Sequence, residues 1–273
     1  MRRFSWFNVV SLTLGFAFLY VPILILIVYS FNAGRNVAVW SGWSTHWYGE
    51  VFQDEQLLDA AWVTLKVGLL SASVATVLGT MAAIALARMG RFPGRLLFTG
   101  MVYAPLVMPE VITGLSLLLL FVAVGFDRGF WTITLAHVTF TMCFVAVVVQ
   151  SRLVGFDRSL EEAAMDLGCR PLGTFFRITL PIIWPAVVSG WMLAFTLSLD
   201  DLVIASFATG PGATTLPMKI YSDVRLGVKP EINAVCTLVI GLISMVVIVA
   251  SVLSKRQEVE RERAERAAFA AGG

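Results

Sequence analysis

Charged residues and metal-binding residue types are scarce in this sequence. Only 14% of its 273 residues are Asp, Glu, Lys or Arg, whereas 58% are hydrophobic, and the mean hydropathy is +0.83. Soluble domains contain about a quarter charged and about half apolar residues, so this composition excludes an ordinary soluble domain and indicates an integral membrane protein. The cysteines Cys143, Cys169 and Cys236 lack C-x-x-C spacing and a nearby pair of histidines, which argues against a disulfide framework and a metal site.

Nucleotide-binding and hydrolytic motifs are also missing. The sequence contains neither G-x-x-x-x-G-K-[ST] nor G-x-G-x-x-G, so this chain is expected to bind no cofactor, and any ATP must be bound by another subunit. It contains no H-E-x-x-H or G-x-S-x-G, and its two histidines, His46 and His137, lie far apart, so no catalytic residues are predicted. We expect His137 to hydrogen-bond a neighbouring helix. The net charge of +2 gives no reason to expect a nucleic-acid partner.

Long apolar runs recur six times, each near the 20 residues that a helix needs to cross a membrane. The first run is too long for a cleavable signal peptide and lacks its small-residue cleavage site. We therefore predict an all-α integral membrane protein with a transmembrane domain over residues 1–254 and a charged cytoplasmic tail over 255–273. The spans are predicted at about 9–30, 60–87, 96–125, 130–154, 182–207 and 232–253.

The distribution of basic residues predicts the orientation of these spans. Fourteen of the 20 Lys and Arg residues fall on the side that carries the N-terminus if six spans are assumed. Cytoplasmic segments carry an excess of Lys and Arg, so we predict that both termini are cytoplasmic. The segment 157–181 then also lies in the cytoplasm.

Within the second run, small residues recur near helical spacing. They let helices approach closely in lipid, so this face is predicted to be a packing seam. Its members are Gly68, Ala72, Thr76, Gly79, Ala83 and Ala87.

Two of the runs carry signals for a helix break. Pro105 and Pro109 interrupt the third run, and proline removes a backbone donor and crowds the preceding turn, so the helix should bend or restart near Pro109. In the fifth run, Ser198-x-x-Asp201 has the spacing of a capping box, which predicts a break and restart there.

The segment 157–181 is too polar to cross a membrane. Ser159 and Glu162 have capping-box spacing, Gly168 suits the left-handed end of a helix, and Pro171 suits the first turn of another. These signals predict two short helices that are joined by a bend at the membrane surface.

The same segment resembles the EAA loop of permease subunits of binding-protein-dependent ABC importers. Seven positions match at the family's spacing: Glu162, Ala163, Ala164, Gly168, Ile178, Leu180 and Pro181. The resemblance implies the MetI-like permease fold and a coupling helix that docks on a cytoplasmic ATPase. The residues expected to make this coupling are Glu162, Ala163, Ala164, Asp166, Gly168 and Arg170.

Further segments are similar to the spermidine/putrescine branch of that family. The resemblance implies a polyamine importer in a bacterial inner membrane, with a sister permease, two copies of an ATPase that binds ATP and Mg²⁺, and a periplasmic substrate-binding protein. Other expected contacts are with membrane lipid. The similar segments are 108–116, 151–153, 197–202, 210–221 and 229–233.

Acidic residues within the apolar runs are candidates for the substrate pathway. Carboxylates in a membrane are costly and usually face a cavity or a partner, so we expect Glu110, Asp200 and Asp201 to offer negative charge to a cation. A structural role is the alternative, because Glu110 stands at a helix start and Asp201 suits a cap. Asp200 and Asp201 point about 100° apart on a helix, so at most one faces a path squarely.

Two alternatives stay open at this point. A self-contained secondary carrier also uses broken helices and acids near the bilayer midplane, although no convincing inverted repeat is present. Within the importer family, the substrate could instead be an iron chelate, sulfate or an amino acid.

Overall fold

The computed structural model describes residues 6–37, 39–227, 229–245 and 248. These residues are helical apart from their connections and one isolated bridge between Asn32 and Trp43. The chain forms two compact units, Met1–Glu55 with Asp223–Gly273, and Gln56–Ser222. The predicted tail 255–273 lies outside the described residues.

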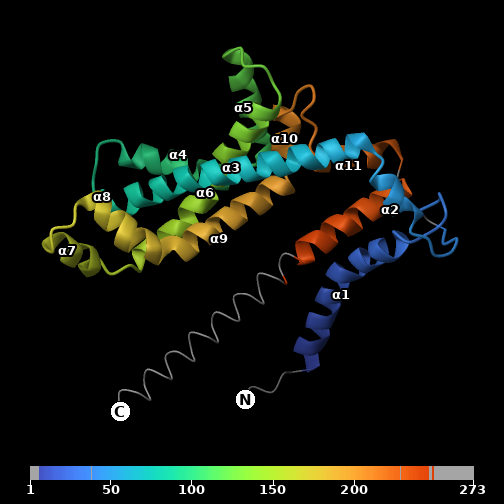
Figure 1. Ribbon diagram of the computed structural model, residues 1–273, viewed down its shortest axis with the longest axis horizontal. Helices are drawn as coiled ribbons and strands as arrows, with labels where there is room; N and C mark the ends of the chain where they lie inside the picture. The colour runs from blue at the N-terminus through green and yellow to red at the C-terminus, as the bar shows by residue number, and fades with distance from the viewer. Residues whose placement is uncertain (1–5, 38, 228, 246–247, 249–273) are drawn as a thin grey trace. The chain divides into compact units, whose positions relative to one another are not determined.

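The helices follow one another along the chain as Figure 1 shows. The helices are α1 Trp6–Tyr29, α2 His46–Val51, α3 Glu55–Arg88, α4 Arg95–Val107, α5 Glu110–Ala123, α6 Phe130–Val154, α7 Ser159–Asp166, α8 Pro171–Thr174, the π-helix η1 Phe175–Thr179, α9 Leu180–Leu199, α10 Val203–Ala208 and α11 Leu216–Leu226. A further apolar helix covers Pro230–Met245.

Four helical stretches of the described residues are long and apolar enough to cross a membrane, namely α1, α3, α6 and Pro171–Leu199. The pair α4 and α5 passes the same test together but is bent by 119°. The all-helical membrane class is thus confirmed. The helix over Pro230–Met245 falls on the predicted sixth span, whose remainder to residue 253 is mostly outside the described residues.

The break between α4 and α5 lies where the prolines predict it. Met108, the residue before Pro109, is extended, with φ −76° and ψ 135°, because the proline ring disfavours a helical conformation there. The carbonyl of Pro109 then accepts hydrogen bonds from the N–H groups of Ile112 and Thr113, which starts α5. The predicted third span is therefore two helices.

In the second unit, α3, α6 and α9 pack closely through small residues. A Cβ atom on Gly79 of α3 would lie 2.6 Å from the carbonyl oxygen of Met142 and 2.8 Å from the Cβ of Val145. A Cβ on Gly190 of α9 would lie 3.2 Å from a methyl group of Val145. Val145 is fully buried between the two glycines, so the seam predicted for α3 is confirmed at Gly79.

A second core in this unit holds α10. Ile204 and Ala205 of α10 are fully buried and share this core with Phe121 of α5 and Ile133 of α6. Gly114 allows α5 to approach closely, because a Cβ there would lie 3.4 Å from the Cα of Ile204. The short helix α10 is therefore enclosed between α5 and α6.

In the first unit, Asn32 organises the loop that follows α1. Its side-chain oxygen accepts a 2.8 Å hydrogen bond from the N–H of Ser41, its amide donates to the carbonyl of Val39 at 2.7 Å, and its backbone carbonyl accepts from Trp47 Nε1 at 2.7 Å. Trp40 and Trp43 pack edge to face in the same loop. Local hydrogen bonds and aromatic contacts thus hold this loop in place of regular secondary structure.

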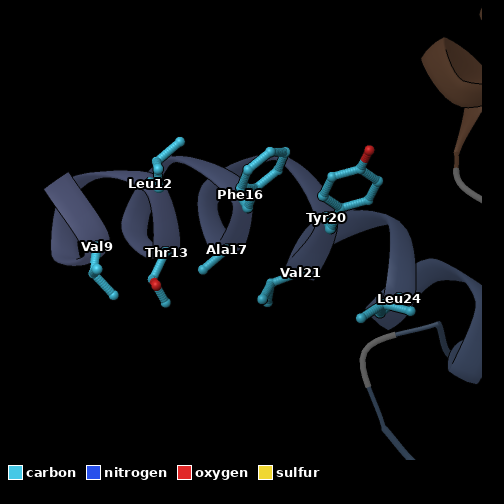
Figure 2. Close-up of a pocket in the computed structure, with 8 residues that line it drawn as sticks. All are labelled: Val9, Leu12, Thr13, Phe16, Ala17, Tyr20, Val21 and Leu24. Carbon is cyan, nitrogen blue, oxygen red and sulfur yellow. The ribbon is translucent and has the colours of Figure 1, made fainter. Parts of the chain in front are cut away.

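Helix α1 is apolar on all sides and has no buried residue. A helix of this kind is typical of a membrane span. Along one side, residues at helical spacing line a shallow apolar groove (Figure 2). They are Val9, Leu12, Thr13, Phe16, Ala17, Tyr20, Val21 and Leu24.

We expect Gly79→Ala to destabilise the packing of α3 on α6, because the new Cβ would meet the Met142 carbonyl at 2.6 Å. Overpacking of this kind costs about 1–3 kcal/mol, so the Tm of the purified protein should fall. Gly100→Ala in α4 is the matched control, since its Cβ would have open space within 4 Å. The control should keep or raise the Tm. Equal Tm values for the two variants would contradict the seam.

Candidate coupling loop and translocation pathway

Helix α7 begins on a cap that the sequence pattern did not predict. The carboxylate of Asp157 accepts a 3.0 Å hydrogen bond from the backbone N–H of Ser159 and another from its hydroxyl, which holds the pKa of Asp157 below its usual value. Ser159 is already the first helical residue, and its hydroxyl is engaged by Asp157. The predicted capping box between Ser159 and Glu162 is therefore wrong, because a carboxylate two residues earlier caps the first turn.

Helix α7 ends in a Schellman motif. Gly168 has φ +89°, in the left-handed region that glycine tolerates. The N–H of Cys169 donates to the carbonyl of Ala164 at 3.0 Å, and the N–H of Gly168 donates to that of Met165 at 2.9 Å. These are the two bonds that define the motif. The prediction of a helix stop at Gly168 is confirmed.

The segment after Gly168 departs from the prediction of a second short helix. Pro171 starts a helix at its first turn, as expected, but the helical stretch then continues without interruption to Leu199. A π turn precedes Pro181, with the N–H of Leu180 bonded to the carbonyl of Phe175 five residues earlier. This wider turn accommodates a proline that would crowd a regular helix. The helix therefore starts at Pro171 and not at residue 182.

Glu161 holds α7 against two other helices. Its Oε1 accepts hydrogen bonds from Arg88 Nη2 at 3.1 Å and from Thr179 Oγ1 at 2.5 Å. The side chains of Arg88 and Glu161 are only 16% and 19% exposed. Arg158 adds a 2.8 Å hydrogen bond to the carbonyl of Ala87. The last turn of α3 and the π turn before α9 therefore fix the position of α7.

The EAA residue that follows Glu161 on α7 is turned away from this contact. Glu161 is turned inward, whereas its neighbour Glu162 is exposed, as expected for adjacent residues about 100° apart on a helix. Leu167 at the end of α7 is 88% exposed. Of the predicted coupling residues, Ala164 is half-buried and the others are exposed: Glu162, Ala163, Asp166, Gly168 and Arg170.

The three candidate acids of the pathway fall into two groups. Glu110 is the first residue of α5 and is exposed, and Asp200 follows α9 and is exposed. Asp201 is only 9% exposed, and its carboxylate accepts hydrogen bonds from the N–H groups of Ile204 at 3.3 Å and Ala205 at 2.7 Å. Asp201 thus caps α10, while Glu110 and Asp200 remain accessible.

Asp201 also belongs to a buried polar cluster, the Ser–His–Asp cluster, which consists of Ser71, His137, Ser198 and Asp201. His137 Nε2 lies 3.1 Å from Asp201 Oδ2, and His137 Nδ1 lies 2.6 Å from Ser198 Oγ. Ser198 Oγ in turn lies 3.0 Å from Ser71 Oγ. The expected hydrogen bond from His137 to a neighbouring helix is confirmed. The predicted break near Asp201 is confirmed too, but Ser198 bonds to other helices and does not cap α10.

No metal site emerges from these acids. Among the described residues, no group of three or more His, Cys, Asp or Glu side chains could hold a metal ion.

Comparison with known proteins gives the family. Residues 75–257 match the family described as "Binding-protein-dependent transport system inner membrane component". The chain belongs to this family. Its members carry the permease role in the inner membrane, so the chain is a multi-pass transport subunit and not an enzyme.

Relatives of this permease are similar over nearly their whole length. The "Putrescine transport system permease protein PotI" of Escherichia coli K12 is 57% identical over 267 residues, which cover 96% of this chain and 95% of the relative. The "Spermidine/putrescine transport system permease protein PotC" of the same strain is 44% identical over 247 residues, or 90% and 93% of the two chains.

A solved structure supports the fold of the permease. A crystal structure of a bacterial alginate ABC transporter, in complex with an alginate-pentasaccharide-bound periplasmic protein, contains a chain with a TM-score of 0.66 and 17% identity. The match covers 89% of this permease and 91% of that chain. At this identity the likeness concerns the fold alone.

Sequence reasoning singled out Glu162 in this permease but missed Glu161, Arg88 and the Ser–His–Asp cluster. Arg88 and Glu161 are 73 residues apart, and His137 and Asp201 are 64 residues apart. Neither pair leaves a local pattern in the chain. The one hint of the Arg88–Glu161 pair was the position of Arg88 at the end of an apolar run. Solvated basic residues are also usual at that position, so the hint did not distinguish the two cases.

We expect Glu161→Ala and Glu162→Ala to differ in stability. Loss of Glu161 leaves the largely buried Arg88 guanidinium without its carboxylate, which should cost about 1–3 kcal/mol and lower the Tm. Because Glu162 is exposed, Glu162→Ala should leave the Tm unchanged, and it serves as the control. An unchanged Tm in Glu161→Ala would show that the contact does not hold α7.

Proposed function

We propose that this chain is one permease subunit of an ATP-driven importer for a polyamine, putrescine or a similar aliphatic amine. The observation that carries this proposal is the 57% identity to a putrescine permease over 96% of the chain. The 44% identity to a spermidine/putrescine permease supports the same substrate class. An importer for an iron chelate, sulfate or an amino acid has no comparable support.

The exposed acids fit a cationic substrate. Putrescine carries two positive charges at neutral pH, because an aliphatic amine has a pKa near 10. Glu110 and Asp200 each present an accessible carboxylate at the start of α5 and after the end of α9. An opposite charge along the path lowers the cost of moving a cation through a low-dielectric region. We therefore assign both residues to the substrate pathway.

The exposed face of α7 fits the role of a coupling surface. Glu162, Ala163 and Asp166 are exposed there, while Glu161 holds the helix to the permease body. Gly168 and Arg170 lie exposed at the bend that follows. A small helix with one fixed face and one free face can transmit a displacement from a docked ATPase to α3 and α9.

The proposed assembly contains this chain, a sister permease, two copies of an ATPase and a periplasmic substrate-binding protein. The ATPases would bind ATP and Mg²⁺, and the solved alginate transporter was crystallised with a periplasmic protein, which supports the last partner. We propose six spans with both termini in the cytoplasm, as the excess of basic residues on that side supports.

In the proposed cycle, ATP brings the two ATPases together, and the displaced α7 opens the pathway to the periplasm. The binding protein then releases the polyamine next to the exposed acids. Hydrolysis returns the pathway to its inward-facing state. This chain supplies half of the pathway and one of the two coupling helices.

We expect Glu162→Arg to abolish putrescine uptake and putrescine-stimulated ATP hydrolysis by the reconstituted complex. The side chain is exposed, so the amount of inserted protein and its Tm should not change. Charge reversal on a docking face opposes association with the partner. Normal uptake by this variant would show that α7 is not the coupling element.

We expect Asp200→Asn to raise the putrescine concentration that half-saturates uptake by about fivefold, which corresponds to the roughly 1 kcal/mol of an accessible ion pair. Uptake kinetics in proteoliposomes measure this change. Asp59→Asn is the control, because Asp59 is an exposed carboxylate in the first turns of α3 and outside the apolar run. A half-saturating concentration equal to that of the unchanged protein would remove Asp200 from the pathway.

A further inference from the structure

The Ser–His–Asp cluster is buried and completely hydrogen-bonded. The exposed fractions of Ser71, His137, Ser198 and Asp201 are 0%, 1%, 3% and 9%. Buried polar groups are costly unless each finds a partner, and here each of the four side chains has one. A satisfied network of this kind favours one arrangement of its helices.

The order serine, histidine, aspartate is also that of a hydrolytic triad, but the surroundings do not suit catalysis. Ser198 is 3% exposed, and its oxygen already lies 3.0 Å from the Ser71 hydroxyl. A substrate carbonyl therefore has no open approach to this oxygen. We therefore assign the cluster a structural role and not a catalytic one.

What the cluster fixes is the break between α9 and α10. His137 of α6 holds the Asp201 carboxylate, which in turn accepts from the first N–H groups of α10. At the other end of α10, Thr132 of α6 donates a 2.6 Å hydrogen bond to the carbonyl of Ala208. Helix α6 thus holds α10 at both ends.

Fixing Asp201 determines the direction of its neighbour. Asp201 is turned inward to His137, whereas its neighbour Asp200 is exposed. We propose that His137 and Asp201 are positioning residues, which hold the carboxylate of Asp200 in the substrate pathway, and that Asp201 does not itself contact the substrate. This inference rests on the pathway role proposed for Asp200.

The first test measures the position of residue 200 without transport. Asp200→Cys is introduced into the full complex after Cys143, Cys169 and Cys236 have been replaced by Ala, and its rate of reaction with a cationic methanethiosulfonate is measured.

His137→Leu, which cannot bond Asp201, should change this rate by about tenfold, as expected for loss of a hydrogen bond to a charged group. His137→Gln retains a donor and should restore most of the rate. Thr134→Val is the control and should have no effect, because the Thr134 hydroxyl donates to the Phe130 carbonyl within the same helix. Equal rates in His137→Leu and the unchanged background would overturn the proposal.

The second test uses Asp201→Asn. This variant keeps the shape of the side chain, so it serves if His137→Leu does not fold. It should raise the half-saturating putrescine concentration when Asp200 is present and add nothing in the Asp200→Asn background, because a positioning residue acts through its neighbour. Additive effects would show that Asp201 contacts the substrate and would overturn the proposal.

If the unchanged complex is not stimulated by putrescine, the proposed function fails. The cysteine reaction rates still decide whether His137 positions residue 200.

Discussion

A helix that stops inside an apolar body must find partners for its free backbone groups, because no water is available to them. This constraint governs the break between α9 and α10. Asp201 satisfies two N–H groups at the start of α10, and the cost of burying its charge is offset by His137 and by those same donors. Asp201, one of the three acids predicted for the substrate pathway, thus caps a helix, whereas Glu110 and Asp200 are accessible.

Helix α3 connects this break with α7. Ser71 in its middle belongs to the Ser–His–Asp cluster, and Arg88 at its end bonds Glu161 of α7. At 1.5 Å per residue, these positions are about 25 Å apart along one uninterrupted helix. The helical stretch that contains Thr179 and Ser198 makes a second connection between the same two places. We infer that a displacement of α7 moves both helices together and reaches the acids as a change in their position.

The sequence predicted much of this arrangement because its strongest signals are local. Pro109 and Gly168 act within a few residues, and the apolar runs and the EAA spacing each lie within one continuous segment of the chain. The structure confirms the helical class, the break after α4 and the end of α7. One error was local, because Asp157 caps the first turn of α7 in place of Ser159. Two other errors arose where a distant partner decided the outcome. Ser198 caps nothing because Ser71 and His137 engage it from other helices, and Glu161 was overlooked because Arg88 lies 73 residues earlier.

The central claim is that the exposed face of α7 docks on a separate cytoplasmic ATPase. Site-directed cross-linking from Ala163→Cys tests it most directly, since Ala163 is exposed on α7 and a thiol adds little bulk there. In membranes that contain the complete importer, a short bifunctional reagent should join the introduced thiol to the ATPase subunit, and ATP should change the yield. Labelling of that thiol by a membrane-impermeant reagent from the periplasmic side, or no cross-link to any ATPase, would contradict it.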